Sequence, residues 1–181
     1  MSYVASETIR LARESDAPEL AEMCALLWPD RSREEHLREV GQKIASGRSG
    51  TLPVVLLIAE EEDGKVSGFI EVGLRSHADG CETARPVGYI EGWYVREAQR
   101  GKGIGRELMQ AAEEWCRQQG CTEIASDALI DNLPSQRAHS ALGFEIVDRC
   151  VHYKKCLGHQ IRGMKNDPGN LRWSLDDRYC L

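Results

Sequence analysis

The segment Arg100-Gly101-Lys102-Gly103-Ile104-Gly105-Arg106 has the clearest chemical pattern in the chain. Glycines at alternate positions let the backbone approach a ligand closely, and the free N–H groups at the start of a helix attract an anion. The three cations of the segment add positive charge beside those N–H groups. The pattern therefore predicts a site for a phosphate-bearing cofactor, although glycine-rich turns also serve as plain connections between a strand and a helix.

Two familiar phosphate-binding patterns do not fit this segment. The dinucleotide-binding pattern needs a third glycine at a different distance and a βαβ unit that starts the chain. The loop of nucleotide-hydrolysing proteins needs a Gly-Lys-Ser or Gly-Lys-Thr sequence, which the segment lacks. A cofactor of another kind is therefore expected.

The elements that must hold this loop follow from hydrophobic periodicity and turn residues. We expect strands over residues 8–12, 54–59, 66–74, 87–95 and 123–127, and one or two further strands over 145–156. We expect helices that start near Ser15 or Asp16 and stop at Trp28, and that cover residues 33–44, 105–120 and 134–142. The order predicts an α/β sandwich with a mixed sheet, in which the loop joins a strand to an amphipathic helix.

Length and composition set the broad class of the protein. The 181 residues are enough for one sizeable core, and the net charge of −6 argues against nucleic acid and suits a cationic small molecule, or merely aids solubility. The N-terminus lacks a leader pattern and no apolar run is long enough to span a bilayer, so we expect a soluble, cytoplasmic protein without a membrane partner. The seven cysteines and five histidines show no metal-ligand spacing, so we expect reduced thiols and no metal.

The end of the chain differs in character from the rest. Residues 158–170 are polar with Gly and Pro and without periodicity, and Trp173, Leu175 and Tyr179 follow. We therefore expect a domain over residues 1–157 and a C-terminal tail over 158–181, which is either disordered or packs on a partner subunit.

Two motifs together resemble the signature of the GNAT superfamily of N-acetyltransferases. They are Arg100-x-x-Gly103-x-Gly105 after a strand that ends in Tyr94-Val95, and Asn132-x-x-Ser135-x-x-x-His139-x-x-x-Gly143-Phe144. The resemblance covers roughly Thr8 to Leu157. Within the superfamily the chain is more similar to aminoglycoside 6′-N-acetyltransferases, through the segments 86–95 and 120–127 and through Leu27-Trp28-Pro29.

The resemblance implies a GNAT-like fold, with a mixed, mostly antiparallel central sheet flanked by helices, and acetyl-CoA as the cosubstrate. It also implies a homodimer, because related enzymes are often dimers. The implied cofactor-binding residues are Trp93, Tyr94, Val95, Arg100, Gly101, Lys102, Gly103, Ile104, Gly105, Arg106, Asn132, Ser135 and His139.

The resemblance also implies an acceptor site with a catalytic group. An acceptor amine must lose a proton before it attacks the thioester. Glu91 lies in a strand just before the implied cofactor-binding residues, and it either takes that proton or only binds the ammonium group. Asp127 and Asp148 are expected to bind ammonium groups, although Asp127 alternatively serves as a helix cap or a loop acceptor. Trp28 is either a core residue or a wall of the acceptor site.

His139 is a departure from the family pattern, because many members have a tyrosine there that gives a proton to the departing thiolate. Histidine can also donate a proton at neutral pH. A purely structural histidine, bonded to cofactor or backbone, is an equally good interpretation. We therefore count His139 with Glu91 as the candidate catalytic pair and keep the alternative open.

The leading interpretation is an acetyl-CoA-dependent aminoglycoside 6′-N-acetyltransferase, which transfers acetyl directly to a primary amine and confers antibiotic resistance. The first alternative is a GNAT enzyme for a polyamine, another small amine or a protein N-terminus. The second is a non-catalytic acyl-CoA-binding module, which the retention of Glu91, Asn132 and His139 disfavours.

Overall fold

The computed structural model describes residues 8–155. The chain divides into two units, Met1–Arg149 and Cys150–Leu181, and every helix and strand of the described residues lies in the first. The expected tail, 158–181, and the boundary proposed after Leu157 lie outside the described residues. No helix of the described part is long and apolar enough to cross a membrane.

A six-stranded sheet forms the centre of the first unit, as expected. Its strands are β1 (Thr8–Leu11), β2 (Arg48–Ser49), β3 (Leu52–Glu60), β4 (Val66–Arg75), β5 (Val87–Val95) and β6 (Ile124–Ser126). The order is β1-β3-β4-β5-β6, with β2 paired to β3 alone. All pairs are antiparallel except β5 with β6, which is parallel.

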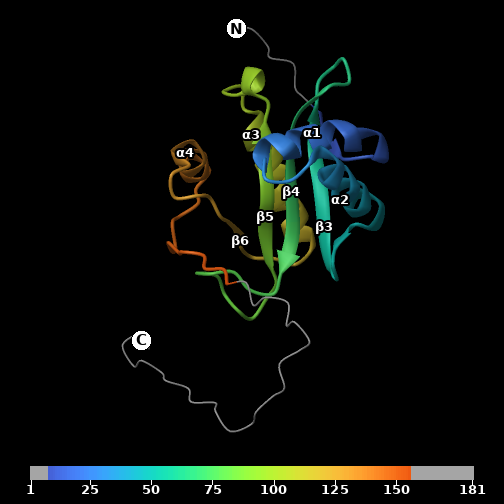
Figure 1. Cartoon of the computed structure of the whole chain (residues 1–181). Coiled ribbons are helices and arrows are strands. Elements are labelled where there is room, and N and C mark those ends of the chain that lie inside the picture. The colour runs from blue at the N-terminus through green and yellow to red at the C-terminus, as the bar shows by residue number, and fades with distance from the viewer. Residues whose placement is uncertain (1–7, 156–181) are drawn as a thin grey trace, which may run out of the picture. The chain divides into compact units, whose positions relative to one another are not determined.

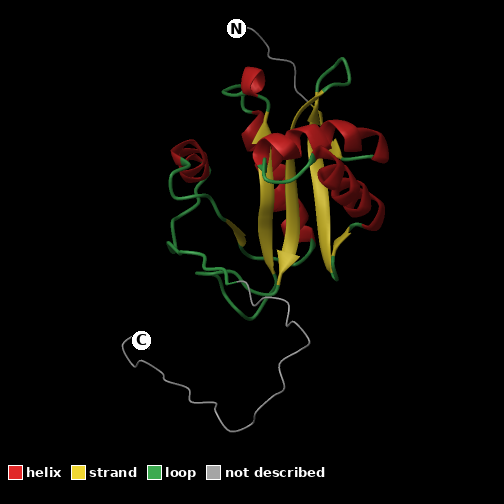
Figure 2. Ribbon diagram, viewed as in Figure 1, coloured by secondary structure: helices red, strands yellow, loops and turns green. Residues whose placement is uncertain are grey.

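Helices cover both faces of the sheet. They are α1 (Ala17–Leu27), α2 (Arg33–Ser46), α3 (Ile104–Gln118) and α4 (Leu133–Ala141). In Figure 1, α1 and α2 lie in front of the sheet and α3 lies behind it, and Figure 2 shows the same layers by secondary structure. One core cluster joins α1 and α2 to β3 and β4, and the other joins α3 to the opposite face.

Local sequence explains where these helices begin and end. At α2, the Ser32 hydroxyl accepts a hydrogen bond from the Glu35 N–H, and the Glu35 carboxylate accepts one from the Ser32 N–H. Gly47, with φ of 63°, ends the helix in the left-handed conformation that glycine adopts most easily. In α3, Leu108, Met109 and other buried residues form the apolar stripe that fixes the helix against the sheet.

An ion cluster fastens β1 to the start of α1. The Arg10 guanidinium contacts the Asp16 carboxylate at 2.7 Å and the Glu60 carboxylate at 2.6 Å. Asp16 also accepts a hydrogen bond from the Arg13 backbone N–H at 2.6 Å. The hydrogen bond from Arg10, followed by that from Arg13, holds the pKa of Asp16 below its ordinary value of 3.8, although burial opposes the shift.

The cysteines of the described residues are all unpaired. Cys24, Cys116 and Cys121 are buried in the core clusters. Burial raises the pKa of the Cys24 and Cys116 thiols to about 12, so these thiols stay protonated and unreactive near neutral pH. They act as apolar core residues, as expected.

The strands expected within residues 145–156 are wrong for the described part of that range, because residues 145–155 contain no strand. Ile146 and Val147 are β-branched and favour extended backbone, but they are 62% and 64% exposed. A strand forms only where a neighbouring strand accepts its hydrogen bonds, and that preference says nothing about such a neighbour.

Candidate active site

The sheet opens between β5 and β6. The two strands pair only over Gly88–Ile90 and Ile124–Ser126, where β6 ends. The chain then turns away from β5 toward α4 (Figure 1). The second half of β5, including Trp93, Tyr94 and Val95, therefore continues without β6 beside it, and its backbone groups face the opening.

Glu91 lies at a bulge beside this opening. Glu71 of β4 faces Gly92 of β5, but the next residue, Val72, faces Ile90, so Glu91 is the extra residue in β5. A β-bulge redirects the side chain of the inserted residue and increases the local twist. The Glu91 side chain is 34% exposed, so its carboxylate is accessible to a ligand.

Four side chains form a connected row across this part of the sheet: one from β4, two from β5 and one from the residue that follows β6. Both oxygens of Glu91 accept hydrogen bonds from Arg75, at 3.0 and 2.8 Å. The Arg75 guanidinium carbon lies 3.3 Å from the centre of the Tyr89 ring, and the Tyr89 hydroxyl donates to Asp127 at 2.7 Å. Burial, together with Asp127, raises the pKa of Tyr89, so the phenol remains a donor. We call Arg75, Tyr89, Glu91 and Asp127 the acceptor row.

The structure thus brings the predicted residues Glu91 and Asp127 together and adds two residues that sequence reasoning missed. Arg75 follows the strand predicted over 66–74, and Tyr89 lies two residues before Glu91 in the strand predicted over 87–95. Alternation along that strand places Tyr89 and Glu91 on one face. No sequence signal joins Arg75 to Glu91, because Arg75 faces Val87 and its contact with Glu91 depends on the register between β4 and β5.

Trp28 lies against the bulge and also packs on the core cluster of α1 and α2, and its part in acceptor binding stays a prediction. A Cβ at Gly92 would lie 2.5 Å from Cη2 of Trp28, so the indole packs directly on the β5 backbone. The buried His36 ring stacks on the indole at 6.0 Å, and its Nε2 lies 3.1 Å from the Trp28 carbonyl oxygen. Glycine at position 92 and histidine at position 36 therefore fix Trp28 next to Glu91.

A buried ion pair supports the bulge from α2. The Lys43 ammonium lies 2.6 Å from the Glu71 carboxylate and 2.6 Å from Glu39. Glu71 is only 2% exposed, and burial raises its pKa while Lys43 opposes the shift. Sequence reasoning did not find this pair. The pair joins α2 to β4 at Glu71, which faces Gly92 of β5 beside the bulge.

The glycine loop has the geometry expected of an anion site. Gly101 and Gly103 have φ of 77° and 97°, a region that other residues enter only at a cost. Gly103 begins α3 without a side-chain cap, so the first N–H groups of the helix are free for a ligand. A Cβ at either glycine would meet nothing within 4 Å, which leaves room above the loop.

The cations of the loop are exposed. Arg100 donates through Nε to the Val95 carbonyl at 3.0 Å, and its guanidinium lies 5.8 Å from the Tyr94 ring centre. Lys102 is bonded to Gln99, and Arg106 lies on the exposed side of the first turn of α3. The loop therefore presents three positive charges to solvent beside the free N–H groups.

Gly105 lies where α3 packs against Trp93. A Cβ there would lie 3.0 Å from Cζ2 of Trp93, so glycine lets α3 pack closely on that indole. The Trp93 indole N–H is buried and has no hydrogen-bond partner among the described residues. Its ring meets His139 edge to face at 5.4 Å. The predicted residues Trp93, Gly105 and His139 thus form one packed group.

The second motif positions α4. The Asn132 side chain accepts a hydrogen bond from the Ser135 N–H at 3.2 Å and caps the helix. His139 Nδ1 lies 2.8 Å from the Ser135 carbonyl, and its Nε2 lies 3.0 Å from the Ser126 hydroxyl. Because a carbonyl only accepts, Nδ1 carries the proton, and in the neutral ring Nε2 accepts from Ser126.

Asp148 is the predicted residue that the structure does not join to the acceptor row. It is exposed, and it accepts a hydrogen bond from the Arg149 backbone N–H at 2.6 Å. Its part in acceptor binding stays a prediction.

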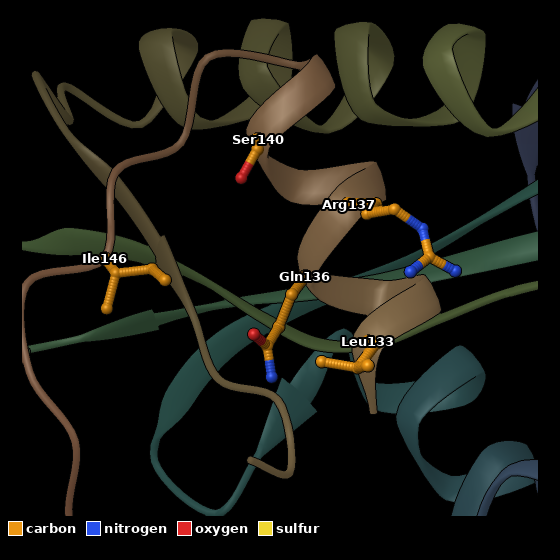
Figure 3. A pocket seen from close by; sticks show the side chains of 5 residues that line it. All are labelled: Leu133, Gln136, Arg137, Ser140 and Ile146. Carbon is orange, nitrogen blue, oxygen red and sulfur yellow. The ribbon is translucent and has the colours of Figure 1, made fainter. Parts of the chain in front are cut away.

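An open hollow of about 320 Å³ lies over the other side of α4 (Figure 3). It is lined by Leu133, Gln136, Arg137, Ser140 and Ile146. None of these is a predicted site residue. The described residues contain no group of three or more His, Cys, Asp or Glu placed to hold a metal ion.

Comparison with known proteins agrees with this geometry. Residues 20–144 match the acetyltransferase (GNAT) family. An aminoglycoside N(6′)-acetyltransferase type 1 of Stenotrophomonas maltophilia is 38% identical over 151 residues, which are 83% of this chain and 94% of the relative.

Solved structures give the same result. The apo crystal structure of an aminoglycoside 6′-N-acetyltransferase from Acinetobacter haemolyticus superimposes with a TM-score of 0.74 and 33% identity, over 83% of this chain and 99% of that one. AAC(6′)-Iy, solved with the bisubstrate analogue CoA-S-monomethyl-acetylneamine, has a TM-score of 0.73 and 29% identity, over 82% of this chain and 97% of that one.

Proposed function

The chain belongs to the GNAT family of acetyltransferases, and we propose that it transfers the acetyl group of acetyl-CoA to the 6′-amine of an aminoglycoside. Such a transfer would remove a positive charge from the antibiotic and confer resistance. The observation that carries the proposal is the acceptor row, in which Glu91 and Asp127 face the same end of the open sheet. The relatives, which align with more than four fifths of this chain, are named as aminoglycoside acetyltransferases.

The residues present fit acetyl-CoA. The free N–H groups that begin α3, with Arg100, Lys102 and Arg106, would hold the phosphates. The backbone of residues 93–95, which faces the opening beside β6, would hold the pantetheine arm. When bound, acetyl-CoA supplies an activated acetyl thioester, and the chain supplies its position and the exclusion of water.

Glu91 is the proposed base. An aminoglycoside amine is mostly protonated at neutral pH, and it must lose a proton before it attacks. The Glu91 carboxylate is exposed at the bulge of β5, two residues before the backbone that would hold the cofactor, and Asp127 lies in the same row to bind a second ammonium group. The Trp28 face closes the site on the side of α1.

We propose that His139 positions α4 and does not act as a proton donor. Its Nδ1–H group is bonded to the Ser135 carbonyl, and its Nε2 is within reach of the Ser126 hydroxyl. A second proton, on Nε2, would be donated to the Ser126 hydroxyl, which can also accept, so both ring nitrogens are engaged by the protein and not directed at a departing thiolate. The observed contacts favour the structural alternative.

A homodimer is also proposed. Exposed apolar side chains gather on and around α4, where Leu129, Ile130, Leu133 and Ile146 are 74%, 67%, 55% and 62% exposed. Apolar side chains in such numbers on one region of a surface are typical of protein interfaces. Light scattering coupled to gel filtration would give twice the chain mass for a dimer, and a single chain mass would refute it.

A cytoplasmic location is proposed as well. The described cysteines are all unpaired, as is usual for proteins of a reducing compartment. Fractionation of the host cells with a redox-sensitive thiol label would test this location. Recovery outside the cytoplasm would contradict it.

The function itself is tested by thiol release. The protein is mixed with acetyl-CoA and, separately, with kanamycin, spermidine or a peptide that has a free N-terminus. We expect thiol release with kanamycin at a rate well above that with the other two acceptors. Release with spermidine alone would favour a polyamine acetyltransferase, and tight acetyl-CoA binding without release from any amine would favour a non-catalytic module.

A further inference from the structure

The acceptor row contains a cation where a cation-binding site is proposed. The Arg75 guanidinium donates from Nε and from one terminal nitrogen to the two oxygens of Glu91, at 3.0 and 2.8 Å. Both oxygens of the proposed base are therefore engaged by the protein itself. Two parallel hydrogen bonds of this kind are the strongest arrangement that a guanidinium offers a carboxylate.

Arg75 also lies over the Tyr89 ring, which links Glu91 to Asp127. Its guanidinium carbon lies 3.3 Å from the Tyr89 ring centre, and the hydroxyl of that ring is bonded to Asp127. The cation thus lies on the aromatic surface that joins the two carboxylates proposed to bind the acceptor.

An acceptor ammonium group and the Arg75 guanidinium cannot both occupy this position. A carboxylate can accept more than two hydrogen bonds, but like charges in contact repel, so the guanidinium opposes a second cation at the Tyr89 side of Glu91. We infer that Arg75 is an internal competitor, which occupies the ammonium position at Glu91 in the free protein and is displaced by each acceptor that binds. This inference rests on the proposed function.

Separating Arg75 from Glu91 requires little free energy. The Arg75 and Glu91 side chains are 41% and 34% exposed, and partly exposed ion pairs contribute little free energy. Arg75 is the last residue of β4, and residues 76–86, which follow it, contain neither helix nor strand, so its side chain can move into solvent without breaking a regular element.

Arg75 also stabilises the acceptor row in the free protein. While no acceptor is bound, the guanidinium compensates the charge of Glu91 and keeps the row ordered through the Tyr89 ring. The same contact lowers the apparent affinity for every cationic acceptor, because part of the binding energy is used to displace it. Arg75 therefore sets the affinity for cationic acceptors and does not act on the chemistry.

The test is the variant Arg75→Gln, compared with Arg117→Gln. Arg117 also forms exposed ion pairs, with Glu113 and Glu114 on α3, so its loss removes the same charge away from the row. We expect KM for kanamycin to fall about three- to tenfold in Arg75→Gln, with less than about a twofold change in KM for acetyl-CoA. We expect Arg117→Gln to behave as the unaltered protein.

A second measurement excludes a merely structural effect. Methylguanidinium added to Arg75→Gln should raise KM for kanamycin again without lowering kcat, because it refills the vacated position. Arg75→Lys, which keeps the positive charge but cannot form the two parallel hydrogen bonds, should give an intermediate KM for kanamycin. It also provides the test if the glutamine variant fails to fold, as judged by circular dichroism.

The outcomes separate the two claims. If the unaltered protein releases no thiol with kanamycin, the proposed function fails. If it does, and KM for kanamycin in Arg75→Gln is unchanged or higher, only the internal competitor is refuted. A lower kcat with unchanged KM would instead make Arg75 a positioning residue for Glu91 and would equally overturn the inference.

Discussion

Replacing Glu91 by glutamine separates its two proposed uses, because glutamine keeps the size of the side chain and removes only the charge and the basicity. Binding of an ammonium group at a side chain that is 34% exposed contributes little, so loss of the charge alone should raise KM for kanamycin only about two- to fivefold. Loss of a general base lowers the rate of the chemical step by about 10²- to 10⁴-fold. We expect kcat to fall by about 100-fold or more in Glu91→Gln.

The assay is steady-state kinetics with kanamycin and acetyl-CoA across a range of pH. The rate of the variant should recover partly as the pH rises, because more of the amine is then unprotonated without help. Glu113→Gln serves as the control, since Glu113 has a similarly exposed side chain, at 29%, in an ion pair on α3. If kcat of Glu91→Gln stays within threefold of the unaltered protein while KM rises, Glu91 only binds the acceptor and the proposed base is refuted.

Three further predictions concern other parts of the molecule. Gly92→Ala would place a Cβ 2.5 Å from Trp28, so thermal melting should show a loss of about 1–3 kcal/mol together with a higher acceptor KM; unchanged values would mean that the indole does not pack on β5. Asp127→Asn should raise KM for kanamycin about two- to fivefold and leave acetyl-CoA binding by calorimetry nearly unchanged, and equal loss of both would count against its acceptor role. Asp16→Asn should lower the free energy of unfolding in urea by about 2 kcal/mol at pH 7, since it weakens the contacts with Arg10. Because the folded pKa of Asp16 lies below 3.8, this contribution is present above pH 3.8 and is lost as the pH falls through the folded value, so a difference that stays constant down to pH 2 would contradict the assignment.

Much of the fold follows from local sequence patterns. The capping residues of α2, the Asp63-Gly64 turn between β3 and β4 and the apolar stripe of α3 each act within a few residues, so their pattern predicts the element that forms. The glycine loop belongs to the same class. Its left-handed glycines and the helix that follows are adjacent in sequence, so the geometry of the loop was predictable without any tertiary contact.

The acceptor row shows where such reasoning stops. Arg75 and Glu91 are 16 residues apart, and they meet through the pairing of β4 with β5. The buried contact of Lys43 with Glu71 likewise depends on how α2 packs on the sheet. Periodicity does not specify register or packing, and therefore the sequence pointed to Glu91 but not to its partner.

The absent strand within residues 145–155 has the same cause. β-Branched residues favour extended backbone, and Ile146 and Val147 are of this type. The strand itself depends on a neighbour to pair with, which is a property of the fold and not of the segment.

The central claim, acetyl transfer to the 6′-amine, is tested most directly by identifying the product. Kanamycin is incubated with acetyl-CoA and the protein, and the product is examined by mass spectrometry and by NMR, beside a reaction with an aminoglycoside that carries a hydroxyl at the 6′ position. We predict the gain of a single acetyl group on the 6′-nitrogen of kanamycin and no acetylated product from the 6′-hydroxyl compound. Acetyl on another nitrogen, equal reaction of the 6′-hydroxyl compound, or no product would contradict the account.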